Sequence, residues 1–476
     1  MSQEHCDVKE TLVSCQNSQG LEIRAGVLRF TRHRVIFEVY TAAVVLRTSE
    51  VLSEFRIVLR ERTVYSGRAV VRSLVSTGMV LICEVSLDEH SWIDVEFTAE
   101  MLQTGGLRNQ FETFLRDWQT LYRILPDYKL IIADMQSYFA ELRLWLDQVE
   151  IGIRSSPSGD RLQLERAVTE ELTRPVIPCV NVLFEKFELV AQGLEEESLA
   201  AHRNYMRRQL HPLVLCAPFA HRAFYKPLGY AGDYELVNMM ARNDHEGASL
   251  YAKVVNTWFL RQAPAEAHRN RIAYLTDVLH EETLRAGRPG RPARVFNIAC
   301  GPARDVQKFI EQHASSDHTS LTLLDFNPET LTDLRSSVER VKARSGRRTE
   351  VEYVKKSVQQ LLKESGRTIE LPDDRRYDLV YCAGLFDYLS DQICQRLMDL
   401  MYDWVAPGGL VVATNVEPSN PLRHGMEHLL DWHLIYRTAA EVRALAPRRA
   451  PPDETRVRSD ATGVNVFLEV RKPVHA

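Results

Sequence analysis

The sequence contains no apolar run that approaches the roughly 18 residues a helix needs to cross a bilayer. Its first ten residues, MSQEHCDVKE, lack the basic and then apolar order of a secretory signal, so we expect a cytoplasmic protein without a membrane span. An excess of charge is missing too, because 59 lysines and arginines stand against 64 acidic residues and leave a net charge of -5. This gives no electrostatic basis for bulk binding to nucleic acid, and we expect no such partner.

Metal-binding patterns are also missing. The eight cysteines never form a C-x-x-C pair, and most stand among apolar residues, which is typical of reduced, buried thiols. The stretch HEETL at 280–284 departs from the H-E-x-x-H pattern of zinc enzymes. We therefore predict no metal site.

Three segments with different patterns follow one another in the 476 residues, a length that allows several domains with cores of their own. Residues 20 to about 98 contain short Val-, Ile- and Phe-rich runs, which predict a small antiparallel barrel or sandwich. The next segment has apolar residues at helical spacing, which Pro126 breaks or kinks. After the linker RAGRPGRP at 285–292, apolar strands alternate with helices, as in a parallel sheet covered on both faces. We predict a multi-domain α+β chain with a β-barrel at 1–100, a helical linker and lid region at 106–285 and an α/β domain at 286–476.

The last segment has the most regular pattern. Its parallel strands are predicted at 294–299, 320–325, 350–356, 377–384 and 409–415, with helices at 304–313, 328–345, 357–366 and 390–406. Residues 456–472 have instead the pattern of a hairpin around the turn Ala461-Thr462-Gly463. A parallel sheet that ends in a hairpin, with one antiparallel strand, resembles the sheet of Rossmann-like methyltransferases.

The turn after the first of these strands, NIACGPA, contains one glycine where a dinucleotide-binding loop has three. Gly301 lets the backbone approach a ligand, but Pro302 removes an N–H donor, so the loop suits a pyrophosphate poorly. S-adenosylmethionine (SAM) has no phosphates and needs fewer such donors. The turn resembles the first motif of class I SAM-dependent methyltransferases, [D/E]-x-G-x-G-x-G, with Ala299 and Ala303 at the first and third glycines and Asn297 in place of the acid.

This resemblance implies further contacts to SAM. Asp325 ends the second strand, where an acid binds the ribose hydroxyls in related sheets. Ser357 stands after the third strand, where members of the family often have an acid that contacts the adenine amine. The implied cofactor-binding residues are Asn297, Ala299, Gly301, Pro302, Ala303, Asp325, Phe326, Asn327, Ser357, Val358, Cys382, Ala383 and Gly384.

Two further segments frame this loop: KPLGYAGDY at 226–234, and residues 415–437 after the fifth strand. Together with NIACGPARD they resemble a bacterial group known as 3-hydroxypalmitic acid methyl ester biosynthesis proteins, which are quorum-signal methyltransferases. The resemblance implies a SAM-dependent O-methyltransferase that esterifies the carboxylate of a 3-hydroxy fatty acid or similar small acid to make a signalling methyl ester. A methyltransferase that acts on another small molecule or on a protein is an alternative, and so is a non-catalytic protein that senses SAM or a nucleotide.

The residues in these two segments supply candidate roles. Lys226, Arg437 or His433 could hold an acceptor carboxylate by charge-assisted hydrogen bonds. Tyr230 and Tyr234 could shield the sulfonium by cation–π contact.

An alcohol or amine acceptor would instead require a general base, for which Asp233, Glu417 or His433 would serve. We predict catalytic roles for Tyr230, Asp233, His433 and Arg437, and substrate contacts for Lys226, Tyr234, Asn415, Glu417 and Tyr436.

The N-terminal barrel resembles the PilZ family, which often binds cyclic di-GMP through R-x-x-x-R followed by [D/N]-x-S-x-x-G. The pair Arg68 and Arg72 has the arginine spacing, as do Arg56 and Arg60, but Val75 stands where the second motif has its serine. We therefore expect a structural or docking barrel that does not bind cyclic di-GMP.

Overall fold

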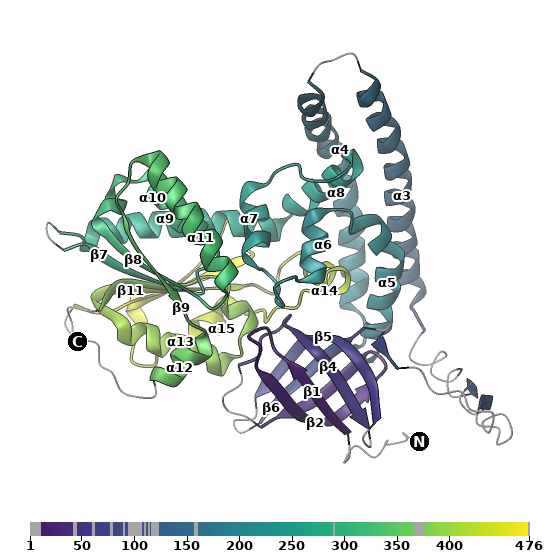
Figure 1. Ribbon diagram of the computed structural model, residues 1–476, viewed down its shortest axis with the longest axis horizontal. Helices are drawn as coiled ribbons and strands as arrows, with labels where there is room; N and C mark the ends of the chain where they lie inside the picture. Colours follow the sequence, from purple (N-terminus) through teal and green to yellow (C-terminus); the bar gives the residue numbers. More distant parts are fainter. Residues whose placement is uncertain are drawn as a thin grey trace.

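The computed structural model contains a barrel, a helical region and a mixed sheet, which follow one another along the chain (Figure 1). It describes residues 11–40, 45–59, 62–76, 80–88, 91–93, 107–108, 111–112, 115, 123–156, 160–288, 291–365 and 376–474. This arrangement confirms the predicted multi-domain α+β fold class.

The barrel is antiparallel and closed, with the strand order β1-β2-β3-β6-β5-β4, and β4 pairs back onto β1. Its strands are β1 (Thr11–Gln16), β2 (Glu22–Thr31), β3 (Arg34–Val39), β4 (Val51–Leu59), β5 (Arg62–Ser76) and β6 (Leu81–Leu87). Alternate residues such as Cys83, Val85 and Leu87 point inward and fill the barrel, as the two-residue period of a strand requires. β1 precedes the predicted runs, and the predicted run at 91–97 is described only to Ile93, where Trp92 forms a bridge to Tyr65.

The helical region consists of α3 (Pro126–Ser155), α4 (Arg161–Gln192), α5 (Leu199–Val214), α6 (Pro218–Tyr225), α7 (Tyr234–Arg242), α8 (Leu250–Leu260) and α9 (Ala263–Ala286). Pro126 starts α3 at a position where a missing N–H loses no helical hydrogen bond. The long helices α3 and α4 form a hairpin that extends away from the rest of the molecule (Figure 1). None of the described helices has the length and apolar composition of a membrane span.

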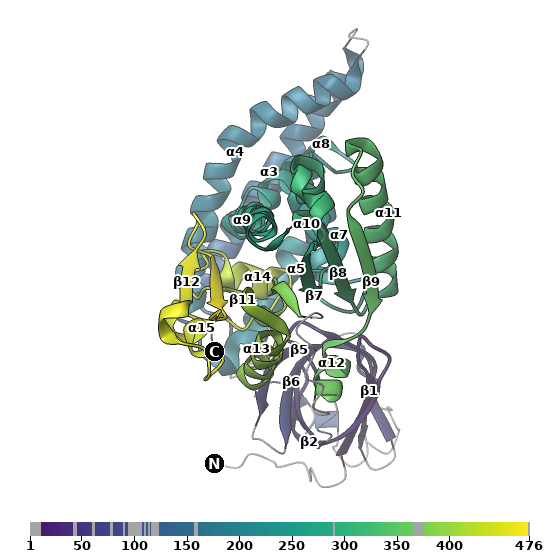
Figure 2. The ribbon, with the colours of Figure 1, turned by 90° about the vertical axis from the view of Figure 1, so that its left-hand side faces the viewer.

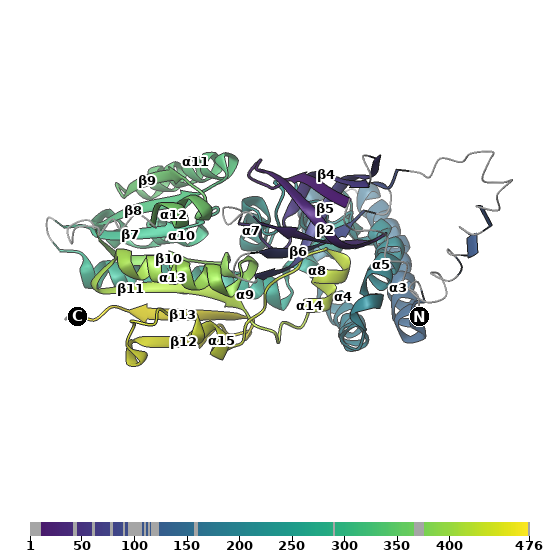
Figure 3. The same ribbon diagram turned by 90° about the horizontal axis from the view of Figure 1, so that it is seen from below.

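The sheet has the order β12-β13-β11-β10-β7-β8-β9, which Figure 3 shows from one edge to the other. Its strands are β7 (Ala293–Ile298), β8 (Thr319–Asp325), β9 (Glu350–Lys355), β10 (Tyr377–Cys382), β11 (Val405–Val416), β12 (Thr455–Ser459) and β13 (Asn465–Arg471). β7 to β11 run parallel, while β13 is antiparallel to both of its neighbours. The predicted hairpin therefore places one antiparallel strand inside the sheet.

Helices cover both faces of this sheet (Figure 1). The helices concerned are α9, α10 (Arg304–Gln312) and α11 (Pro328–Ser345) on one face, and α12 (Val358–Ser365), α13 (Asp391–Trp404) and α15 (Ala439–Ala444) on the other. In β10, Leu379 and Tyr381 pack under the first group, whereas Val380 and Cys382 pack under the second. This burial on both faces explains the nearly continuous apolar runs of the strands.

The barrel lies against the edge of the sheet at which the parallel strands end, and Figure 2 shows it below the sheet. A short segment before β4 makes this contact, because the Thr48 N–H donates to the carbonyl of Tyr388 and the Val51 N–H donates to the carbonyl of Gly229. The helical region contacts the same edge through the segment before α7, where the Tyr230 ring lies 5.3 Å from that of Phe326, the residue after β8. All three parts of the chain therefore meet at one place.

Candidate active site

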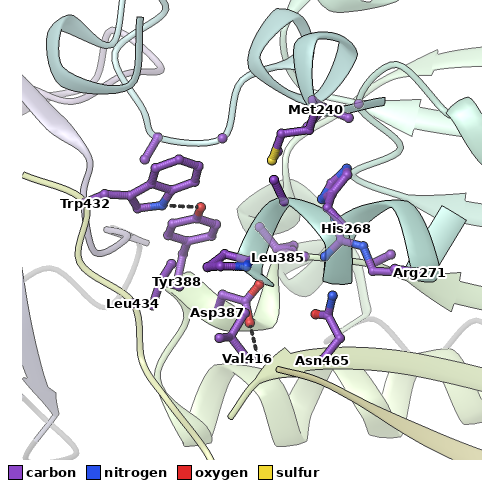
Figure 4. Close-up of a pocket in the computed structure, with 18 of the residues that line it drawn as sticks. Met240, His268, Arg271, Leu385, Asp387, Tyr388, Val416, Trp432, Leu434 and Asn465 are labelled. Atoms are coloured by element: carbon purple, nitrogen blue, oxygen red, sulfur yellow. Dashed lines mark hydrogen bonds between the residues drawn. The ribbon is translucent and has the colours of Figure 1, made fainter. Parts of the chain in front are cut away.

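A cavity lies at this meeting point. The loops after β7, β8 and β10 form one wall, helices α7, α8 and α9 form another, and α14 (Arg423–Leu429) and the barrel segment before β4 complete it (Figure 4). Loops that leave the carboxyl ends of parallel strands form the ligand crevice of open α/β sheets. The position of the cavity is that of a ligand site.

The loop after β7 approaches the cavity through left-handed backbone turns. Ala299, Gly301 and Ala303 have φ values of +52°, +53° and +42°, at the three positions where the resembling motif has glycine. A Cβ built on Gly301 would have no atom within 4 Å, although Gly301 lines the cavity. The missing side chain therefore leaves space for a ligand to lie against the backbone.

Asp325 ends β8 beside this loop and also lines the cavity. Its buried carboxylate accepts hydrogen bonds from the N–H groups of Asn327, at 2.9 Å, and Gly301, at 3.1 Å. Burial raises the pKa of Asp325, and these two N–H groups oppose the rise. Phe326 follows it, with its ring 5.3 Å from that of Tyr230.

Several predicted cofactor contacts line the cavity and several do not. Those that line it are Asn297, Ala299, Gly301, Pro302, Ala303, Asp325, Phe326, Ala383 and Gly384. Asn327 caps α11, where its side chain accepts two backbone N–H groups, and the Ser357 hydroxyl accepts the Gln360 N–H at the start of α12. Val358 and Cys382 are buried in the core beneath the sheet. These four residues support the loops around the cavity without facing it.

In the GYAGDY segment, too, one predicted residue lines the cavity and another does not. Tyr230 lines the cavity, and burial raises the pKa of its hydroxyl. Asp233 caps α7 by accepting the Leu236 N–H at 3.0 Å, and it forms an ion pair with Arg222 at 2.7 Å. Both contacts hold Asp233 away from the cavity, so its carboxylate stabilises the GYAGDY segment and the start of α7.

His433 and Arg437, the other two predicted catalytic residues, are buried outside the cavity. His433 lies 3.0 Å from the Asp431 carboxylate, and burial lowers the pKa of its imidazole to about 4. Arg437 pairs with Asp391 at 2.7 Å and donates to the carbonyl of Phe386 at 2.8 Å. These contacts fix the chain between β11 and α15.

The predicted substrate residues lie mostly in the framework as well. Lys226 is buried and donates to the carbonyl of Leu430 at 3.3 Å, and burial lowers the pKa of its ammonium group to about 7. Tyr234 lines the cavity, while its hydroxyl donates to Glu329 at 2.9 Å.

Three further predicted substrate residues lie along the chain after β11. The Asn415 amide donates to the carbonyl of Ile435 at 2.9 Å, and Glu417 accepts a backbone N–H of the turn that follows it. The Tyr436 ring is covered by the guanidinium of Arg423, 4.7 Å from the ring centroid. None of the three lines the cavity among the residues described for it.

Helix α9 supplies two cavity residues that the sequence reasoning missed. His268 and Arg271 are one helical turn apart, and an Arg271 Nη2 group donates to His268 Nδ1 at 2.8 Å (Figure 4). The Arg271 guanidinium lies against Gly384, where a Cβ would come within 2.8 Å of its Nη1 atom. A histidine and an arginine three residues apart in a helical pattern were the only available signal in the sequence, and such a pair is equally typical of an ordinary helix.

Asp387 and Tyr388, after β10, face the same part of the cavity (Figure 4). One Asp387 oxygen accepts the Val416 N–H at 2.7 Å, and the Tyr388 hydroxyl accepts the Trp432 indole N–H at 3.0 Å. Burial raises the pKa of Asp387, and the charge of Arg271 opposes that rise. Donors and acceptors thus surround one polar region of the cavity.

Beyond this polar region the cavity is apolar. Its lining there comes from Phe184 of α4, Phe219 of α6, Trp258 of α8, and Met426, Leu429 and Leu430 in and after α14. Glu188 of α4 accepts the first backbone N–H groups of α14, at 2.7 Å and 3.0 Å, and so fixes that helix on the bundle. We call this apolar part of the cavity the apolar arm.

A match to a family model agrees with this geometry. Residues 295–409 match the family model described as a methyltransferase domain. The search of curated proteins gives no match.

Among solved structures, a possible exported protein from Bordetella parapertussis is 17% identical over 67% of this chain and 99% of that chain, with a TM-score of 0.40. Magnesium protoporphyrin IX methyltransferase from Synechocystis PCC 6803 with bound S-adenosylhomocysteine (SAH) is 10% identical over 44% of this chain and 84% of that chain, with a TM-score of 0.31. The N-methyltransferase NodS from Bradyrhizobium japonicum WM9 with SAH is 16% identical over 50% of this chain and 98% of that chain, with a TM-score of 0.29.

The matched residues include Gly301, Asp325 and Gly384, which lie at or after the ends of β7, β8 and β10. The C-terminal part of the chain is a SAM-dependent methyltransferase domain, and SAM is its cofactor. The residues present fit that cofactor, because the open space at Gly301 admits a ligand without phosphates and Asp325 places a hydrogen-bond acceptor in the wall.

Proposed function

We propose that this protein transfers the methyl group of SAM to the carboxylate of an amphipathic small acid, such as a 3-hydroxy fatty acid, and releases a methyl ester. The observation that carries the proposal is the lining of the cavity, which combines the cofactor loop, a hydrogen-bonded arginine–histidine pair and the apolar arm. The resemblance of NIACGPARD and its flanking segments to fatty-acid O-methyltransferases supports the same acceptor class and a signalling role for the ester.

SAM supplies an electrophilic methyl group: an acceptor oxygen forms the new C–O bond while the C–S bond breaks and its electron pair stays on sulfur, which leaves SAH. The loop from Ala299 to Ala303 and the Asp325 carboxylate would hold the nucleoside part. No proton has to move when the acceptor is a carboxylate, because a carboxylic acid is ionised at pH 7. The residues of the cavity then have to orient the acceptor and exclude water.

His268 and Arg271 are suited to hold the acceptor carboxylate. His268 Nδ1 accepts a hydrogen bond from Arg271, so the proton of the neutral ring is on Nε2. Burial, and then the charges of Arg271 and Arg269, lower the pKa of His268 well below its usual value, so the ring is neutral at pH 7. The pair therefore offers N–H donors and a positive charge, and both bind a carboxylate. Neither group serves as a general base in this arrangement.

Asp387 provides the acceptor side of the polar region. One of its oxygens is bound to the Val416 N–H, and the other is available to accept a hydrogen bond from a hydroxyl group of the substrate. A hydroxyl near the carboxylate, as in a 3-hydroxy acid, satisfies both sides of the region at once.

The barrel takes a structural role in this proposal. Arg68 donates to the carbonyls of Phe224 and Tyr225, at 3.4 Å each, and Arg72 pairs with Glu84 at 3.1 Å. Arg68 and Arg72, one of the two arginine pairs with PilZ-like spacing, are thus engaged with the protein itself, which supports a barrel that does not bind cyclic di-GMP; Arg60 of the other pair lies outside the described residues.

The test is transfer of label from methyl-labelled SAM to a series of 3-hydroxy fatty acids, followed by solvent extraction. We expect an extractable product that mild alkali hydrolyses, because esters are alkali-labile and ethers are not. The variant Arg271→Met should lose most of the transfer, whereas Arg340→Met, which alters an exposed arginine of α11, should retain it. Alkali-stable product, or label found only in protein, would assign a different acceptor.

A further inference from the structure

The barrel extends a buried segment into the wall of the methyltransferase cavity. Residues 45–50 precede β4, and within them Arg47, Thr48, Ser49 and Glu50 are 7%, 3%, 0% and 0% exposed. Connecting segments usually run over the surface, because a buried one must satisfy all of its backbone polar groups. We call residues 45–50 the barrel insert.

The barrel insert is fastened to the catalytic part at several points. The Thr48 N–H donates to the carbonyl of Tyr388 at 3.2 Å, and the Ser49 hydroxyl donates to the carbonyl of His433 at 2.8 Å. From the barrel side, the Ser49 N–H donates to the carbonyl of Val71 at 2.7 Å. The insert is therefore held between the two parts of the molecule.

Glu50 fixes the conformation of the insert from within. Its carboxylate accepts the N–H of Arg47 and the N–H of Ser18, each at 2.9 Å. The backbone of Arg47 is thus tied to β4 and to the turn after β1, so the direction of its side chain is set by the barrel.

The Arg47 side chain lines the cavity with its guanidinium unpaired. The Cζ atom lies 4.5 Å from the Phe326 ring centroid and 5.9 Å from that of Tyr230. Among the described residues this guanidinium has no hydrogen-bond acceptor and no ion-pair partner within 4 Å, although the residue is only 7% exposed. Its charge opposes the rise of the Asp325 pKa, so it lies close enough to attract that carboxylate, and its N–H donors are available to a ligand in the cavity.

The position of Arg47 indicates which part of the ligand its guanidinium contacts. Phe326 directly follows Asp325, which the resemblance assigns to the ribose, whereas His268 and Arg271 belong to the proposed acceptor site. We propose that Arg47 is a cofactor-binding residue supplied by the barrel, and that its guanidinium contacts the adenosine part of SAM. This inference rests on the assignment of Asp325 to the ribose but not on the identity of the methyl acceptor.

The test is calorimetric titration of the full chain with SAH and, separately, with 5′-methylthioadenosine, which lacks the amino-acid part. Arg47→Met keeps an aliphatic side chain but removes the guanidinium, and Arg47→Ala removes both. We expect each variant to weaken binding of both ligands by about tenfold to a hundredfold, as loss of a hydrogen bond from a charged group does. Asp325→Ala should weaken both ligands too, and Arg56→Met, on the exposed face of β4, should weaken neither.

Two results would overturn the proposal. Binding of SAH by Arg47→Met within twofold of wild type, with an unchanged melting temperature, would remove Arg47 from the cofactor site. A loss with SAH but not with 5′-methylthioadenosine would move its contact to the amino-acid end. Because neither ligand is a methyl acceptor, failure of the fatty-acid proposal would leave both titrations unaffected.

Discussion

At Gly301 the cofactor loop turns its backbone toward the cavity and leaves open the space that a side chain would fill. Ala299 and Ala303, two residues to either side, have similar positive φ values with a methyl group in place. An L-residue in this conformation costs about 1–2 kcal/mol relative to the right-handed region. The fold tolerates this strain at both alanines, so the left-handed backbone conformation alone does not explain why residue 301 is a glycine.

We therefore predict that Gly301→Ala lowers the free energy of unfolding by only about 1–2 kcal/mol but weakens SAH binding by more than tenfold, since the methyl group enters the ligand space. The reverse change, Ala299→Gly, should leave SAH affinity within a factor of about three. Thermal unfolding and calorimetric titration measure the two effects separately. Equal affinity of Gly301→Ala and wild type would show that no ligand lies against this backbone.

Residues near strand ends could be predicted from the sequence, because a strand followed by a tight turn places its last residues at the crevice whatever the rest of the chain does. Gly301 and Asp325 were found in this way. The roles of Lys226 and Arg437 could not be predicted, since a sequence does not reveal whether a buried cation contacts a ligand or a backbone carbonyl. Arg271 was missed because only the packing of α9 against Gly384 brings it into the cavity.

At the scale of elements, α14 forms part of the apolar arm, where we propose that the acceptor binds. Its Met426 and Leu429 line the apolar arm, and its first turn is fixed by Glu188 of α4. A flexible thioether fills irregular apolar space, so Met426 is a position at which the size of the arm can be altered.

We predict that Met426→Phe shortens the acyl chain that the enzyme accepts. The stiffer ring should raise KM for the longest accepted acid by about tenfold, as expected for overpacking of 1–3 kcal/mol, while KM for short acids changes little. Steady-state kinetics over an acyl series measures this, with the short acids as the internal control. A uniform change across the series would mean that the acceptor does not enter the arm.

At the scale of the whole molecule, the barrel, the helical region and the sheet each contribute to one cavity. The parallel sheet and its terminal hairpin could be predicted, because strands and helices alternate regularly and the last segment has the pattern of a hairpin. The contact between barrel and sheet could not be predicted, because Arg47 and Thr48 have no pattern that distinguishes them from an ordinary loop, and their role depends on residues more than 150 positions away. Tertiary contacts of this length leave no periodic signal in a single sequence.

The charges of this shared cavity predict the pH dependence of the reaction. Burial lowers the pKa of His268 well below its usual value, which favours the neutral ring, and a carboxylic acceptor with a pKa of about 4–5 is ionised between pH 6 and 8. We expect kcat/KM to be flat between pH 6 and 8 and to fall at lower pH, as the acceptor gains a proton. A rise of about tenfold per pH unit in that range would require a general base and would contradict carboxylate methylation.

The central claim is that the cofactor loop, the arginine–histidine pair and the apolar arm belong to one site for an amphipathic acid. A crystal structure of the full chain with SAH and a 3-hydroxy fatty acid tests it most directly. We expect the carboxylate within hydrogen-bond distance of Arg271 and His268, and the acyl chain between Met426 and Trp258. A carboxylate bound elsewhere, or a chain that leaves the arm unfilled, would contradict it.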